Sequence, residues 1–228
     1  MNQRINESTN NNYPQVKVCG LTSVEQAVGC ADLGANAIGC VFFPKSPRHL
    51  SEIQAKEISM ALPSEVKKVG VFVNESFPNI MHKVEFCRLN AVQLHGRESP
   101  ELVSRLQKEN LLVIKALFAE GKPTMDEAKI YEASAFLVEC GKGVLPGGNA
   151  IEWNWEKVKS FGGKYPLILA GGLAPENISH AVSVSMPDAV DVSSGVESAP
   201  GQKDLGKVKS FLKAVSMCEL KKNLRKIF

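Results

Sequence analysis

Short apolar segments alternate with helix-like segments along almost the whole chain, and this alternation limits the possible folds more than any other feature. The apolar segments predict strands at 16–21, 37–43, 67–73, 91–96, 113–118, 135–140, 167–172 and 189–195. Helical patterns follow them at 23–33, 51–61, 76–89, 99–109, 125–133, 154–161, 175–185 and 204–217. Strands that alternate with helices in this way predict a parallel sheet.

Eight strand–helix units without a long linker favour a single closed (β/α)8 barrel of the TIM type. The 228 residues suit this fold, which takes roughly 250 residues and at least about 200. An open, doubly wound sheet is the alternative, but the GxGxxG fingerprint of that fold is missing after the first strand. We expect a disordered, Asn-rich lead-in over 1–14, the barrel over 15–217, and a basic extension over 218–228 that is solvated, either helical or not.

Charge and cysteine content narrow the range of partners. The net charge of +3 is too small to indicate nucleic acid, whereas an anionic small molecule fits it. No apolar stretch approaches the ~18 residues of a membrane span. The six cysteines form no CxxC pair, which indicates reduced thiols. The polar start of the chain contains no signal peptide, so we expect a cytoplasmic protein.

Two glycine-containing motifs follow the last two predicted strands. GGL stands at 171–173, and DAVDVSSGV at 188–196. In an eight-fold barrel, the loops after the seventh and eighth strands supply backbone N–H groups that bind phosphate, together with the N-terminus of a short helix. Glycine suits such loops because a Cβ atom would keep phosphate oxygens away from the backbone. The pair of motifs therefore predicts a phosphorylated small-molecule ligand.

Three reactive side chains stand near the carboxyl ends of predicted strands. Alternate residues of a barrel strand point inward, and the last inward residue reaches the active site. Cys19 shares its inward set with Lys17, and Asp191 shares its own with Ser193. Glu139, from the sixth strand, should join them at one mouth. A buried, unpaired carboxylate is costly, so we interpret Glu139 and Asp191 as functional. Position alone favours simple core packing for Cys19.

Other candidate residues have ordinary alternatives. His95 pairs with Gln93 on the inward side of the fourth strand, where a titrating role and a structural role are both open. Arg48 lies in a Pro-rich loop, and its guanidinium suits a carboxylate or phosphate, although an exposed surface arginine is an equal alternative. The histidines at 49, 82, 95 and 180 show no metal-ligand spacing, so we expect no metal.

Several sequence blocks, in the same order along the chain, resemble the phosphoribosylanthranilate isomerase family of tryptophan biosynthesis. These blocks are KVCGLT (17–22), GANAIGCVFFPKSPR (34–48), VGVFVN (69–74), VQLHG (92–96), LAGGLAPENI (169–178) and DVSSGVESAPGQKD (191–204). The resemblance implies the (β/α)8 barrel and an Amadori rearrangement of N-(5-phosphoribosyl)anthranilate to a ribulose-phosphate amine. It implies no metal or cofactor.

The resemblance also implies roles for individual residues. Cys19 matches the general base that removes the C2′ proton of the sugar. Glu139 stands where the family has the aspartate that protonates the furanose ring oxygen. Arg48 matches the arginine that binds the anthranilate carboxylate. Asp191 matches a carboxylate that lies near the amine and hydroxyls of the substrate. The phosphate-binding positions match Gly171, Gly172, Ser194 and Gly195.

This base must be at least partly ionised, and we expect Lys17 or Arg48 to assist the ionisation of the Cys19 thiol. The departures from the family pattern cluster around Glu139, whose side chain is one methylene longer than aspartate. The family's GGTG-x-x-FDW is here GGNAIEWNW (147–155). We expect Trp153, Asn149 and Ala150 to belong to a loop that has changed together with Glu139.

Three hypotheses of function follow. The first is the isomerase, as a monomer or homodimer. The second is a diverged paralogue that acts on another phosphoribosyl-amine or phosphosugar. The third is a non-catalytic barrel that binds a phosphorylated ligand, which the presence of both Cys19 and Glu139 disfavours.

Overall fold

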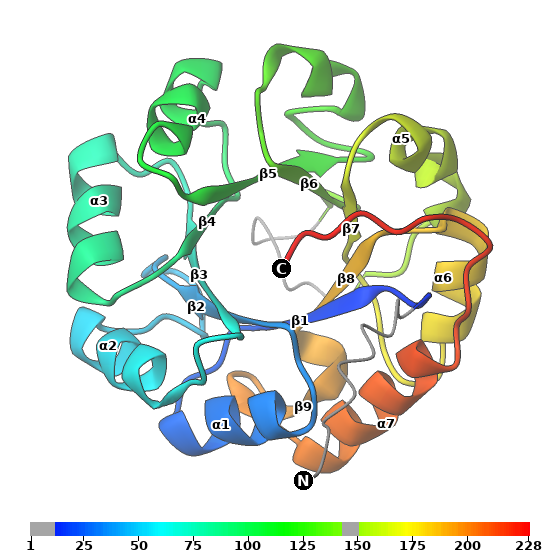
Figure 1. Cartoon of the computed structure of the whole chain (residues 1–228), viewed down its shortest axis with the longest axis horizontal. Coiled ribbons are helices and arrows are strands. Elements are labelled where there is room, and N and C mark those ends of the chain that lie inside the picture. Colours follow the sequence, from blue (N-terminus) through cyan, green and yellow to red (C-terminus); the bar gives the residue numbers. More distant parts are fainter. Residues whose placement is uncertain (1–11, 143–150) are drawn as a thin grey trace, which may run out of the picture.

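The computed structural model describes residues 12–142 and 151–228, and eight parallel strands close into one barrel within them (Figure 1). The barrel closes where β1 pairs with β8, with Lys17 opposite Asp191. Closure confirms the (β/α)8 barrel and excludes the open sheet. The strands are β1 (Gln15–Cys19), β2 (Ala37–Val41), β3 (Lys67–Phe72), β4 (Ala91–Leu94), β5 (Leu112–Phe118), β6 (Ala135–Glu139), β7 (Leu167–Leu169) and β8 (Ala189–Val192).

Helices surround the barrel at the predicted places. They are α1 (Val24–Asp32), α2 (Glu52–Ala61), α3 (Phe77–Phe86), α4 (Pro100–Gln107), α5 (Lys159–Lys164), α6 (Ile178–Ser185) and α7 (Leu205–Ser216). Side-chain caps begin the first four of them; Ser99, for example, accepts a hydrogen bond from the backbone of Leu102. Such caps satisfy N–H groups that have no partner inside the helix.

Three details differ from the prediction. The segment after β5 forms a 3-10 helix, η1 (Met125–Ile130), because the connection is short and such tight turns serve short connectors. The expected helix at 154–161 begins as a 3-10 turn, η2 (Trp155–Val158), before α5. A small hairpin of β9 (Glu197–Ala199) and β10 (Gln202–Lys203) follows the 3-10 turn η3 (Ser194–Val196) and was not predicted.

Strand residues alternate between two apolar layers. Residues such as Val18 and Leu94 pack outward against the helices, whereas Ile114, Leu137 and Ile168 fill the barrel interior. This alternation is the period of two that β-strands impose. It confirms the inward set that contains Leu137, and it places Glu139 on the inside of the barrel.

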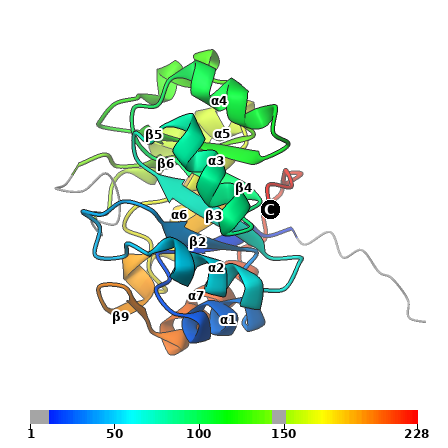
Figure 2. The ribbon, with the colours of Figure 1, turned by 90° about the vertical axis from the view of Figure 1, so that its left-hand side faces the viewer.

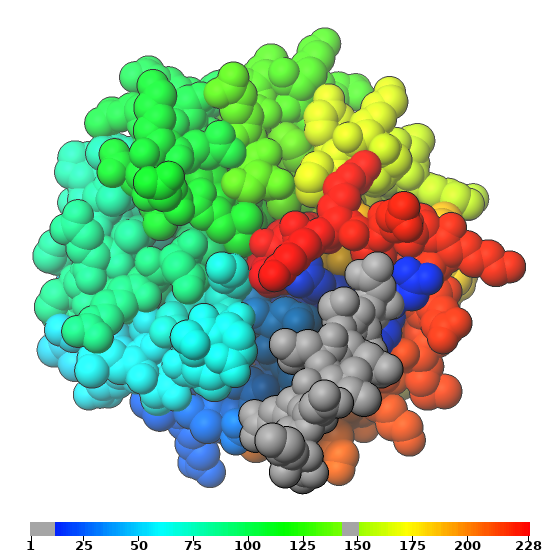
Figure 3. Space-filling model, in the orientation of Figure 1, coloured from blue at the N-terminus to red at the C-terminus, as the bar shows by residue number. Residues whose placement is uncertain are grey.

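The segment 218–228 corrects the expectation of a solvated or helical extension. It crosses the amino-terminal end of the barrel (Figures 1 and 3), opposite the end that carries β9 (Figure 2). Ile227 and Phe228 are only 7% and 5% exposed. Both polar atoms of the Gln15 side-chain amide bind the backbone of these two residues. The N–H of Ile227 donates to Oε1 at 2.7 Å, and Nε2 donates to the Phe228 carbonyl at 2.9 Å.

The basic residues of this segment are also paired rather than solvated. Lys222 and Arg225 donate to the fully buried carboxylate of Asp188, at 2.9 and 3.2 Å. A buried carboxylate needs such partners. The segment is therefore held by an ion-pair cluster at its start and by apolar burial at its end.

Candidate functional site

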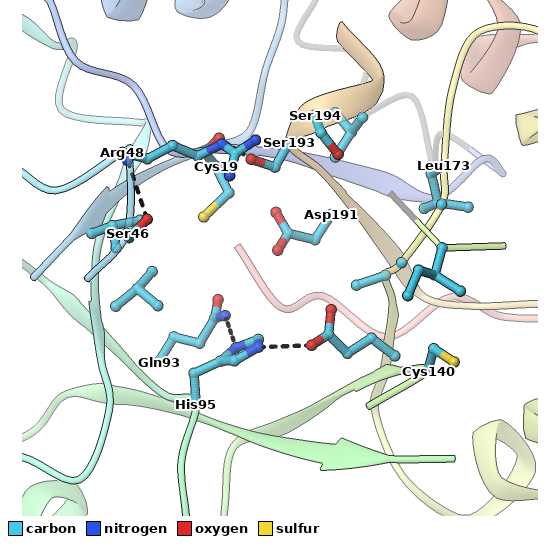
Figure 4. A pocket seen from close by; sticks show the side chains of 18 of the residues that line it. Cys19, Ser46, Arg48, Gln93, His95, Cys140, Leu173, Asp191, Ser193 and Ser194 are labelled. Carbon is cyan, nitrogen blue, oxygen red and sulfur yellow. Dashed lines mark hydrogen bonds and ion pairs between the residues drawn. The ribbon is translucent and has the colours of Figure 1, made fainter. Parts of the chain in front are cut away.

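A pocket opens at the carboxyl ends of the barrel strands, where (β/α)8 enzymes place their active sites. Figure 4 shows Cys19 and Asp191 pointing into it from one side and Gln93 and His95 facing them. Most of the site residues predicted from the sequence line this pocket: Cys19, Arg48, Glu139, Gly171, Gly172, Asp191 and Ser194. Gly195 does not line it.

Lys17 and Asp191 form a buried ion pair beneath Cys19. The Nζ atom of Lys17 donates to Oδ1 of Asp191 at 2.9 Å, and the lysine is fully buried. Burial opposes the lysine charge, but the neighbouring carboxylate outweighs it and raises the pKa of Lys17. Gly39 leaves the room for this arrangement, because a Cβ atom there would stand 2.7 Å from Sγ of Cys19 and 3.1 Å from Nζ of Lys17.

The surroundings of Cys19 correct one expectation. Burial raises the pKa of the thiol, and the positive charge of Lys17 only partly offsets this. The assistance that we expected from Lys17 is therefore present, but the expectation that modest assistance suffices is corrected, because burial outweighs it. A thiolate formed in this setting is a correspondingly stronger base.

Glu139 is held by a chain of polar side chains that runs from β4 to β6 along one side of the pocket. Its Oε1 lies 3.0 Å from Nε2 of His95, and Nδ1 of the same ring lies 2.8 Å from Nε2 of Gln93. The ring of Phe118 packs edge-on against His95. His95 thus holds the candidate acid in place, which is consistent with the structural role among the two that its position in the sequence left open.

Arg48 is buried rather than exposed, because the hairpin after β8 folds over it. Its Nε and Nη2 atoms donate to the two oxygens of Glu197 at 2.8 and 2.7 Å. Lys203 donates to the same carboxylate at 2.5 Å. Burial disfavours the charged form of Glu197, but these partners hold its pKa below the ordinary value.

Glu197 and Lys203 are functional candidates that the sequence analysis missed. They lie on β9 and β10, and neither strand shows a clear pattern in the sequence. Two cations on one carboxylate leave a net positive charge at this side of the pocket. The remaining N–H groups of Arg48 can therefore receive an anion.

The loops after β6 and β7 are packed together. This packing gives Gly172 and Gly195 a structural role besides the predicted binding of phosphate. Trp153 donates from Nε1 to the Ala170 carbonyl at 3.0 Å. A Cβ atom on Gly172 would lie 2.7 Å from the backbone of Glu152, and one on Gly195 would lie 2.0 Å from the Leu173 carbonyl oxygen. Close backbone approach thus already requires glycine at 172 and 195, apart from any contact with phosphate.

Comparison with known proteins identifies the family. The family model described as N-(5'phosphoribosyl)anthranilate (PRA) isomerase matches residues 16–214. The chain belongs to this isomerase family. This confirms the resemblance seen in the sequence, and it favours the isomerase over the diverged paralogue and the non-catalytic barrel.

Individual family members are similar over nearly their whole length. An N-(5'-phosphoribosyl)anthranilate isomerase from Desulfatibacillum aliphaticivorans is 49% identical over 214 residues, which are 94% of this chain and 98% of that protein. The crystal structure of the Thermotoga maritima isomerase superposes with a TM-score of 0.81 at 41% identity, covering 89% and 98% of the two chains. A further isomerase structure, with TM-score 0.78 and 40% identity over the same shares of the two chains, contains reduced 1-(o-carboxyphenylamino)-1-deoxyribulose 5-phosphate.

Two further observations concern the described residues alone. Within 12–142 and 151–228, no group of three or more His, Cys, Asp or Glu side chains is arranged to hold a metal ion. No helix in these ranges is long and apolar enough to cross a membrane. Asn149 and Ala150, expected to differ together with Glu139, lie outside the described residues, whereas Trp153 packs beside Glu139 at Gly171.

Proposed function

We propose that this chain catalyses the Amadori rearrangement of N-(5-phosphoribosyl)anthranilate to 1-(2-carboxyphenylamino)-1-deoxyribulose 5-phosphate. One observation carries the proposal: a thiol from β1 and a carboxyl group from β6 line the same pocket of a barrel of this family. The rearrangement needs an acid at the ring oxygen and a base at C2′, the two sugar atoms on either side of C1′, and the two side chains supply both.

The reaction proceeds in two proton transfers that involve protein side chains, followed by a tautomerisation. Glu139 donates a proton to the furanose ring oxygen as the C1′–oxygen bond breaks, and the nitrogen lone pair forms a C1′=N bond. Cys19, as thiolate, removes the proton from C2′, and the electron pair of that C–H bond forms the enolamine. A proton shift from the enol oxygen to C1′ then gives the ketone. Proton transfer by a placed side chain contributes about 10²–10⁴-fold to a rate.

The ends of the substrate fit the two sides of the pocket. Arg48 receives the anthranilate carboxylate through the N–H groups that Glu197 leaves unused. The phosphate binds between the loop at Gly171 and Gly172 and the turn at Ser194, with Gly195 behind them. Asp191 lies near the amine and hydroxyls of the sugar. Backbone N–H groups at such turns suit phosphate binding.

Turnover of synthetic N-(5-phosphoribosyl)anthranilate tests the proposal. The purified chain should convert it without added metal or cofactor, and the loss of substrate fluorescence would report the reaction. Tight binding without turnover would instead indicate a binding barrel. Absence of both would indicate a different phosphorylated substrate.

The same proposal includes the cellular location and the oligomeric state of the protein. We place it in the cytoplasm, supported by six cysteines that form no disulfide. It acts as a monomer or a homodimer; the isomerase of Thermotoga maritima is described as dimeric in a structure of its monomeric forms. Sedimentation equilibrium would decide between the two states.

A further inference from the structure

The amide group of Gln93 has one end without a partner. The side chain is 1% exposed and lines the pocket. Among the residues that the structure describes, its Oε1 is the one buried side-chain oxygen or nitrogen that lacks a hydrogen bond. An unsatisfied buried acceptor costs about 1–3 kcal/mol, and such atoms in native proteins call for an explanation.

The nitrogen of the same amide determines which atoms donate and which accept in the hydrogen bonds from Gln93 to Glu139. The Nε2 atom of Gln93 can only donate, so Nδ1 of His95, 2.8 Å away, accepts. The imidazole proton then stands on Nε2, which faces Oε1 of Glu139 at 3.0 Å. The ring therefore donates to one oxygen of the carboxyl group and leaves the other oxygen for proton transfer.

We propose that Gln93 is both a ligand-binding and a positioning residue: Oε1 accepts a hydrogen bond from a hydroxyl or amine N–H of the bound sugar-amine, while Nε2 fixes the His95 tautomer that holds Glu139. The ligand half of this inference rests on the proposed function. The tautomer half rests on the free protein alone.

Two substitutions separate the two halves. Gln93→Met has a similar shape but removes both the acceptor and the donor. Gln93→Glu keeps an oxygen toward the ligand but replaces the donor by a carboxylate, which can only accept. Nδ1 of His95 must then donate to it, so the imidazole proton moves from Nε2 to Nδ1. Gln107→Met, on α4 and outside the pocket, is the matched control.

The first experiment needs no ligand. Nitrogen-15 NMR of histidine-labelled protein, with His95 assigned by the His95→Gln variant, reports which ring nitrogen carries the proton. The parent protein should show protonated Nε2 and bare Nδ1, and Gln93→Glu should move the proton to Nδ1. A parent spectrum with protonated Nδ1 would overturn the tautomer half, whether or not either Gln93 variant folds.

The second experiment measures kcat and KM with N-(5-phosphoribosyl)anthranilate. Gln93→Met should raise KM about threefold to tenfold, the loss of one neutral hydrogen bond, and should lower kcat about tenfold. Gln93→Glu should keep KM within about twofold and still lower kcat, whereas Gln107→Met should change neither. Unchanged constants in a folded Gln93→Met would overturn the ligand half. A parent protein that does not turn over this substrate would overturn the proposed function and the ligand half together, and the NMR result would stand apart from both.

Discussion

At the scale of single residues, the chemistry depends on side chains that the barrel brings together from distant parts of the chain. Lys17 and Asp191 are 174 positions apart, and His95 and Glu139 are 44 apart. The reactive groups stand at or near the carboxyl ends of their strands, because the last inward residues of a barrel strand reach the mouth of the barrel. Small changes of side-chain length should therefore alter the rate strongly.

Glu139→Asp restores the residue that the family resemblance expects, yet it should lower kcat about 10²-fold. The carboxyl group would retreat by about 1.5 Å, one C–C bond, and misplacement on this scale can have that effect. The hydrogen bond from His95 would also lengthen. Steady-state kinetics measures the loss, with Glu101→Asp on the surface of α4 as the control. A Glu139→Asp enzyme as fast as the parent would show that the pocket is not matched to the longer side chain.

Alkylation of Cys19 by iodoacetamide should be slow at pH 7 and should accelerate about tenfold per pH unit up to pH 8.5. Burial raises the pKa of this thiol, so the reactive thiolate is a small fraction that grows with pH throughout that range. Mass spectrometry of peptides follows Cys19 separately from Cys140, which also lines the pocket. A rate that levels off below pH 8 would contradict a raised pKa.

At the scale of elements, the sequence predicts the barrel well because its signals are local. Each strand is an apolar run next to a helical pattern, and each early helix begins at a cap such as Ser51 or Ser99. The β9 hairpin could not be predicted in this way, since its purpose is the long-range contact of Glu197 with Arg48. The same contact explains why Arg48 is buried although its loop looks like an exposed one.

Gly172→Ala should destabilise the protein by about 1–3 kcal/mol. The residue has φ +72°, and a Cβ atom would press against the backbone of Glu152; strain of this kind costs that amount. Gly163→Ala is the matched control, because it is exposed, lies in α5 and has nothing within 4 Å of the added atom. It should stabilise by about 0.4–1 kcal/mol. Urea unfolding measures both, and equal effects would refute the packing of the two loops.

At the scale of the whole molecule, the two ends of the barrel serve different purposes. The carboxyl end carries the pocket, and the amino end is covered by Ile227 and Phe228. The sequence showed the basic character of this last segment but not its place. Its ion pairs and apolar contacts form only once the barrel exists, so local patterns carry no sign of them.

Phe228→Ala should lower the free energy of unfolding by about 2–3 kcal/mol, toward the lower end of the range for buried aromatic residues, and should leave kcat unchanged. Thermal and urea unfolding measure the loss, and Met217→Ala, at a side chain that is 74% exposed, is the control. A Phe228→Ala protein as stable as the parent would show that the segment does not help to hold the barrel.

The central claim is that Cys19 and Glu139 are the base and the acid of one isomerisation. The most direct test is steady-state turnover of N-(5-phosphoribosyl)anthranilate by Cys19→Ser and Glu139→Gln, with circular dichroism to establish that both variants are folded. Each folded variant should lose about 10²–10⁴-fold in kcat while still binding the reduced product analogue. A folded variant of either kind that keeps half of the parent rate would contradict the claim.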